Sequence, residues 1–214
     1  MIRIINLFFI IFFLLSSKAY SLIEIDITRG NLDPLPIAVS PLFQDDNSKR
    51  NSINELKIEN VGSEISLVVE NNLKISGLFN PLSKEAFLQK PDIAHLKPRF
   101  EDWALIKAQA LITGKVTIED KKLKVEFRLW DILAGREMMA LAFTTVPGNW
   151  RRVGHIISDK VYERLTGEKG YFDTRIIYVS EEGPKTARVK KLAIMDQDGF
   201  NTKYLTLGNE LVLT

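Results

Sequence analysis

The chain has 214 residues, and 45% of them are hydrophobic, so it can bury one sizeable core and has room for a second, smaller unit. It contains no cysteine, which excludes disulfides, thiol catalysis and a lipid attached to cysteine. The formal net charge of +2 comes from Arg3 and Lys18. The residues after Ser21 hold 27 basic and 27 acidic side chains, a balance that gives no reason to expect nucleic acid or anionic lipid as a partner.

The first 21 residues are typical of a secretory signal peptide. Arg3 precedes the apolar block Leu7–Leu15, and small and polar residues follow. The block is shorter than the ~20 apolar residues of a membrane-spanning helix. We therefore expect residues 1–21 to be a signal peptide cleaved after Ser21. The exported chain then stays out of the membrane, which in a Gram-negative bacterium places it in the periplasm.

Two segments of strand character follow, and then a polar stretch. Residues 22–28 (LIEIDIT) alternate isoleucine with polar side chains, which is the period of a strand with one buried face. Residues 35–43 (LPIAVSPLF) predict a short buried strand. The polar residues of Gln44–Asn60 predict a solvated loop.

Two amphipathic helices are predicted further along the chain. Residues 63–77 carry apolar side chains at spacings of three and four, with Ser63 as the expected N-cap. Residues 149–167 carry the same spacing between Asn149 as the N-cap and Gly167 as the C-cap. These are the two main helices of the predicted fold.

The residues between the two helices predict a connector and then strands. Residues 79–103 contain three prolines and indicate a connector with at most one short helix, and a short helix follows over residues 101–109. Residues 110–120 predict a strand, and residues 122–145 predict a hairpin that turns at Ala134-Gly135. We expect an α/β domain over residues 22–168, with a mixed sheet of about four or five strands.

Beyond Gly170 the chain predicts only short strands and turns, so residues 169–214 are expected to form an all-β unit. The run DQDG (196–199) within it fits either a calcium loop or a tight turn. A calcium-binding EF-hand loop with Gly199 at position 6 would have Ile194 at position 1 and Leu205 at position 12, where it needs oxygen ligands. The sequence favours an Asp-Gly turn between two strands.

The sequence carries no recognisable catalytic motif, nucleotide-binding loop or metal-binding motif. Its two histidines are His95, in the connector, and His155, inside the long second helix. For His155 we favour packing or hydrogen bonding at a boundary between helix and sheet over catalysis. We expect no enzyme activity, no cofactor and no metal.

Several segments in order resemble the TolB family, soluble periplasmic components of the Tol-Pal envelope system. The most specific is RLTGEKGYFDTRIIYV (164–179), and PIAVSPLF from Pro36, LKISGLFNPL from Leu73 and ALITGKV from Ala110 also match. The sequence departs from the family pattern at Leu42, where an aromatic residue is expected, and in the length of the polar stretch Gln44–Asn60.

The resemblance implies a six-bladed β-propeller after the α/β domain. Only 44 residues follow Gly170, about one blade of ~40 to 45 residues, so residues 169–214 would be the start of an incomplete propeller. It also implies a non-enzymatic adaptor that links a TolA-like inner-membrane protein to a Pal-like lipoprotein. Such an adaptor supports outer-membrane integrity, protein import and envelope constriction in cell division. The alternative, a secreted serine hydrolase gated by a propeller, lacks a visible nucleophile elbow and triad.

Family members engage TolA through their first mature residues and Pal through the propeller. By position, the resemblance assigns TolA binding to one short segment: Leu22, Ile23, Glu24, Ile25, Asp26 and Ile27. The simpler alternative is an ordinary edge strand that buries its isoleucines in its own sheet. A strand at the start of a chain can also leave its sheet and pair with a foreign sheet edge.

Overall fold

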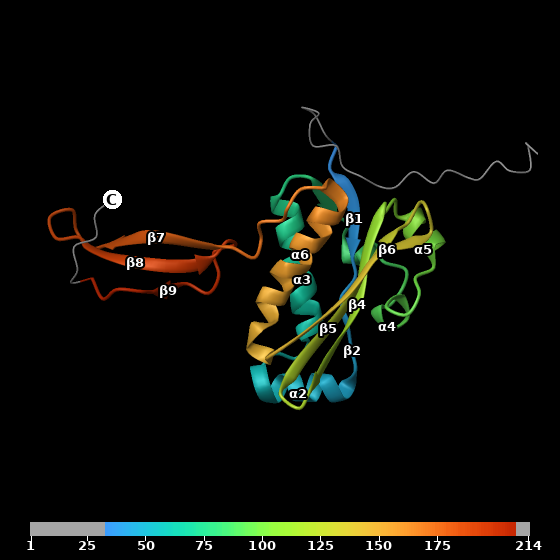
Figure 1. Cartoon of the computed structure of the whole chain (residues 1–214), viewed down its shortest axis with the longest axis horizontal. Coiled ribbons are helices and arrows are strands. Elements are labelled where there is room, and N and C mark those ends of the chain that lie inside the picture. The colour runs from blue at the N-terminus through green and yellow to red at the C-terminus, as the bar shows by residue number, and fades with distance from the viewer. Residues whose placement is uncertain (1–32, 209–214) are drawn as a thin grey trace, which may run out of the picture.

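The structure, a computed structural model, describes residues 33–208. The predicted signal peptide, its cleavage site and the predicted strand over residues 22–28 lie outside these residues. The described residues form a mixed α/β unit followed by a small antiparallel sheet, which Figure 1 shows to one side of the helices.

A six-stranded mixed sheet organises the described part of the first unit. Its order is β3-β1-β4-β5-β6, and β2 also pairs with β4. The strands are β1 (Leu35–Val39), β2 (Phe43–Gln44), β3 (Phe79–Pro81), β4 (Ala110–Glu119), β5 (Lys122–Asp131) and β6 (Arg136–Thr145). β1 is parallel to β3 and β4, whereas β4, β5 and β6 are antiparallel. The predicted buried strand and the hairpin are therefore confirmed, and Gly135 turns the hairpin with a positive φ of 63°.

Two helices, α3 (Val61–Ile75) and α6 (Trp150–Thr166), pack together on one face of this sheet (Figure 1). Alternate residues of β5, such as Val125 and Phe127, point into this core and are almost fully buried. Gly167 ends α6 in the left-handed conformation, as predicted. The N-cap of α3 is Asn60, not Ser63: the Asn60 side chain accepts a hydrogen bond from the Ser63 backbone N–H. Within residues 33–208, no helix has both the length and the apolar character to cross a membrane.

The opposite face of the sheet carries a smaller core. Residues 82–108 form a short 3-10 helix η1 (Lys84–Ala86) and two short helices, α4 (Pro91–Ala94) and α5 (Phe100–Leu105). They bury Trp103 against Trp130 and their neighbours. The connector thus holds more structure than predicted. Its three-residue strand β3 and four-residue helix are too short to show a period in the sequence.

The expected loop over Gln44–Asn60 is wrong, because α2 (Asp46–Leu56) fills most of it. The buried face of this helix is made of serines rather than apolar residues, so it has no hydrophobic period. Ser48 and Ser52 are 2% and 0% exposed. Ser52 donates a hydrogen bond to the Ile58 backbone oxygen, and Asn51 donates one to the Ile118 backbone oxygen. Hydrogen bonds to the end of β4 therefore hold α2 where apolar contacts usually would.

A three-stranded antiparallel sheet follows the first unit, with the order β7-β8-β9. Its strands are β7 (Arg175–Glu182), β8 (Val189–Asp196) and β9 (Lys203–Tyr204). The predicted all-β character is confirmed for the described part of this segment. Before β7, Phe172 is fully buried against α6, and Asp159 of that helix accepts hydrogen bonds from the backbone N–H groups of Phe172 and Asp173. The chain between the two units is therefore packed onto α6.

The N-cap of α2 gives a test of the unexpected helix. Asp45 accepts a hydrogen bond of 2.8 Å from the Ser48 backbone N–H. We expect Asp45→Ala to lower the free energy of unfolding by about 1 kcal/mol, whereas Asp45→Asn keeps a capping oxygen and costs little. The measurement is chemical denaturation at pH 7. This backbone hydrogen bond also lowers the pKa of Asp45, so the Asp45 contribution is present at neutral pH and is lost as the pH falls through the lowered pKa. Equal stability of the two variants would contradict the capping role.

Candidate functional site at the junction of the two sheets

The described residues form a pocket of about 530 Å³ between the start of α6 and the ends of β7 and β8. Its walls carry several ionisable side chains: Arg151, Arg152, His155, Asp173, Arg175, Asp196 and Lys203. Four of them are lysine or arginine and two are aspartate, and Arg152 and Asp173 form a two-pronged ion pair. The pocket therefore has a mixed charge rather than one sign.

A buried hydrogen-bond network connects α3, α6 and the turn after β8. The Asn72 side chain is fully buried, and its nitrogen lies 2.9 Å from His155 Nδ1 and 2.9 Å from Ser158 Oγ. Its oxygen accepts a hydrogen bond of 3.0 Å from Gln197 Nε2. The amide of Asn72 thus connects His155 and Ser158 of α6 to Gln197 in the β8–β9 turn. Gln197 lies 125 residues after Asn72 in the sequence.

This hydrogen-bond network determines which nitrogen of the His155 ring carries the proton. The Ser158 hydroxyl donates to the Gly154 backbone oxygen, so Ser158 Oγ accepts from Asn72. With its oxygen turned to Gln197, Asn72 presents N–H groups to the ring, and His155 Nδ1 acts as an acceptor. Burial lowers the pKa of His155, although the carboxylate of Asp198 opposes this shift, so the ring is neutral at pH 7.

An ion pair forms the second link between the units. Arg151 of α6 donates to the Asp198 carboxylate, and both side chains are largely buried, at 15% and 8% exposed. The Arg151 guanidinium also lies 4.1 Å from the centre of the Phe200 ring. The first turn of α6 therefore holds the β8–β9 turn by a charge pair and a cation–π contact.

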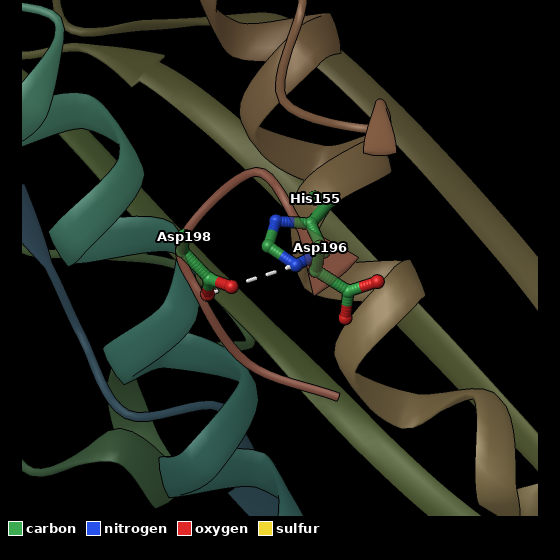
Figure 2. Close-up of side chains that lie close together, drawn as sticks. All are labelled: His155, Asp196 and Asp198. Atoms are coloured by element: carbon green, nitrogen blue, oxygen red, sulfur yellow. Dashed lines mark ion pairs between the residues drawn. The ribbon is translucent and has the colours of Figure 1, made fainter. Parts of the chain in front are cut away.

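The DQDG run is a turn, as the sequence favoured. The Gly199 backbone N–H donates to the Asp196 oxygen, the Asp196 N–H donates to the Phe200 oxygen, and Gly199 has a φ of 85°. The turn nevertheless brings its two carboxylates to a histidine. Figure 2 shows the His155 ring directed at Asp198, with Asp196 beside it. One nitrogen or oxygen of each of these three residues lies within 4.8 Å of the others.

The geometry does not form a serine hydrolase triad. The carboxylate of Asp198 faces His155 Nε2 at 3.8 Å, whereas Ser158 is on the side of Nδ1 and contacts the ring only through Asn72. Ser158 is fully buried within a helix, and its hydroxyl is used by the Gly154 backbone oxygen. A substrate could not reach it.

The structure places the residues singled out from the sequence in different regions. Leu22–Ile27, the predicted partner-binding segment, lies outside the described residues. His95 stacks on Phe43, 4.5 Å between ring centres, far along the sequence from the junction. His155 is buried and hydrogen-bonded, as the sequence analysis favoured. The sequence analysis missed Asn72, Arg151 and Gln197, because polar residues in helices and turns give no signal of a shared site.

Comparison with known proteins identifies the family of the chain. The model of the family described as the TolB amino-terminal domain matches residues 23–138, which are more than half of the chain. The chain belongs to the TolB amino-terminal domain family. The predicted resemblance to TolB is therefore confirmed.

Two relatives illustrate the match to TolB. The chain is 79% identical over 206 residues to the Tol-Pal system protein TolB of Pelagibacter ubique, and these residues are 96% of this chain and 46% of that protein. The crystal structure of TolB from Acinetobacter baumannii superposes with a TM-score of 0.65 at 23% identity, covering 81% of this chain and 39% of that chain. The chain therefore spans less than half of the length of either TolB relative, and the second likeness concerns the fold alone.

The Asn72 amide provides a test of the junction. Asn72→Ala leaves His155 Nδ1, Ser158 and Gln197 without this partner in a buried site, so we expect the free energy of unfolding to fall by about 1–3 kcal/mol. The matched control is Asn71→Ala, on the exposed side of the same helix, which should change it by less than about 0.5 kcal/mol. Urea denaturation of both variants measures the difference. Equal effects would show that the network contributes nothing to stability.

Proposed function

We propose that this chain is the amino-terminal part of a non-enzymatic periplasmic adaptor of the Tol-Pal system. In this role it links a TolA-like inner-membrane protein to a Pal-like, peptidoglycan-associated lipoprotein, and so supports outer-membrane integrity, protein import and envelope constriction during division. The observation that carries the proposal is the 79% identity to the Tol-Pal system protein TolB over nearly the whole chain. An identity this high over nearly the whole chain supports a shared fold and a shared role.

We further propose that residues 169–214 begin a β-propeller and that residues 1–21 are a signal peptide. The antiparallel sheet β7-β8-β9 has the strand arrangement of part of a propeller blade. Its β7 strand exposes Ile176 and Ile177, at 41% and 61%. Apolar side chains of this kind suit packing against a neighbouring blade.

In this proposal the TolA-like partner binds the first mature residues, Leu22–Ile27. Their alternation predicts a strand with isoleucine on one face and acidic side chains on the other. A strand of this kind can add to the open edge of a partner sheet, where main-chain hydrogen bonds give affinity and the isoleucines give specificity. The charges of the acidic side chains can make the segment bind one TolA-like partner more tightly than another.

The test replaces residues 22–28 by a glycine-serine segment of equal length. We expect binding to the cognate TolA C-terminal domain, measured by calorimetric titration, to fall by at least tenfold, while the melting temperature stays within about 2 °C. The matched control is the same replacement in the exposed loop of residues 184–188, which should leave both quantities unchanged.

Each result has a clear meaning. Undiminished TolA binding by the 22–28 variant would refute the assignment of this segment. Lost binding together with a collapsed melting transition would favour the alternative, in which the isoleucines belong to the protein's own core.

Binding of the Pal-like lipoprotein is proposed to need the propeller. We expect this chain to capture Pal at least tenfold less than the full-length Pelagibacter ubique relative does, because the chain spans 46% of that protein. A pull-down at equal concentrations of the two proteins measures the ratio, and TolA binding by both provides the positive control. Equal capture of Pal would contradict the propeller assignment.

A further inference from the structure

His155 carries an unusual buried atom. The residue is 3% exposed, and within residues 33–208 its Nε2 atom has no hydrogen-bond partner. Asp198 Oδ2 lies 3.8 Å from this nitrogen, too far for a hydrogen bond. A buried polar atom without a partner is destabilising and calls for a physical explanation.

The surroundings of Nε2 are those of a cation site. Asp196 and Asp198 each offer a carboxylate oxygen, and these oxygens and the histidine nitrogen lie within 4.8 Å of one another. One imidazole and two carboxylates are a ligand set that suits zinc and related divalent transition metals. We propose that His155, Asp196 and Asp198 bind a divalent transition-metal ion, with zinc as the best fit, at the junction of α6 and the β8–β9 turn.

Each proposed ligand already has a supporting partner. Asn72 contacts the second nitrogen of His155 at 2.9 Å, Asn201 donates to Asp196 at 2.5 Å, and Arg151 donates to Asp198. Such outer partners orient metal ligands in most metal sites. A carboxylate has about four lone-pair positions, so Asp198 can keep Arg151 and still bind the ion.

The three ligand atoms must move closer together to hold one ion, from distances of up to 4.8 Å. Ligand atoms around one tetrahedral zinc ion lie about 3.3–3.5 Å apart, given bonds of about 2.0–2.2 Å. The His155–Asp198 distance of 3.8 Å is close to this value. Three protein ligands leave a fourth position for water, and His155 and Asp196 both line the 530 Å³ pocket.

Metal binding also requires a coordinated rearrangement of the hydrogen-bond network around His155. A ligating Nε2 must carry a lone pair, so the ring proton moves to Nδ1. Asn72 must then present its oxygen to the ring and its nitrogen to Gln197, which in turn presents its oxygen. The Ser158 hydroxyl, which now accepts from Asn72 and donates to the Gly154 oxygen, must turn to donate to the Asn72 oxygen. The metal would thereby fix the α3, α6 and turn contacts in a second hydrogen-bond arrangement. This inference is independent of the proposed binding of TolA and Pal.

The experiment is calorimetric titration of zinc chloride into the chelator-treated chain at pH 7.5, with magnesium chloride as a comparison. We expect one zinc ion per chain and no binding of magnesium in the same range. His155→Gln and Asp196→Asn should each weaken zinc binding by about 100-fold or more, beyond the 10–100-fold typical of losing an outer partner. His95→Gln, which removes the other histidine, should leave zinc binding unchanged.

A second measurement guards against unfolding of the variants. The imidazole ¹⁵N resonances of the wild-type chain should show Nδ1 protonated and Nε2 metal-bound with zinc, and the reverse proton position in chelator. The proposal is overturned if the wild-type chain binds no zinc, if His155→Gln binds zinc as the wild type does, or if His95→Gln abolishes binding. Unchanged ¹⁵N resonances on zinc addition would overturn it as well.

Discussion

The close approach of α3 and α6 is the constraint on which the junction depends. A Cβ atom at Gly154 would lie 2.9 Å from Val68 Cγ1, so a larger residue would push the two helices apart. One turn beyond this contact, Asn72 of α3 reaches both His155 and Ser158 of α6 at 2.9 Å. Hydrogen bonds weaken steeply with distance, so a separation of even 1 Å would break both contacts. The smallest residue in α6 therefore sets the position of its buried polar groups.

The long periodic elements could be predicted from the sequence because burial repeats along them. α6 and the β5–β6 hairpin are the clear cases: their apolar residues recur at helical and strand spacing, and Gly167 and Gly135 mark the ends. The helix α2 could not be predicted in this way. Its buried residues are Ser48 and Ser52, which bond to neighbouring backbone, and a serine gives the same signal in a loop as in such a contact.

The candidate site could be predicted only in pieces. The turn at DQDG could be predicted, because a turn of this kind depends on the local preference of glycine for a positive φ and of aspartate for turn positions. The partners of that turn were not, since Asn72, His155 and Gln197 are separated by 83 and 42 residues and meet only through tertiary packing. A single sequence records the type of each polar residue but not which distant residue it faces.

The second sheet is held against the first unit mainly by polar contacts. Within the described residues of that sheet, only Ala193 is fully buried among apolar side chains, so the sheet adds little hydrophobic stabilisation of its own. The contacts with the first unit are instead mainly directional: Gln197 with Asn72, and Asp198 with Arg151. A neutral hydrogen bond such as that between Gln197 and Asn72 contributes about 1 kcal/mol net, because water competes for the same groups, and one between charged groups contributes about 1.5–3 kcal/mol. These hydrogen bonds still restrict the orientation of the second sheet, since each donor must point at its acceptor. A junction of this kind fixes the angle between the two units through aligned donors and acceptors, whereas the buried Phe172 and the two backbone hydrogen bonds to Asp159 attach the connecting chain to α6.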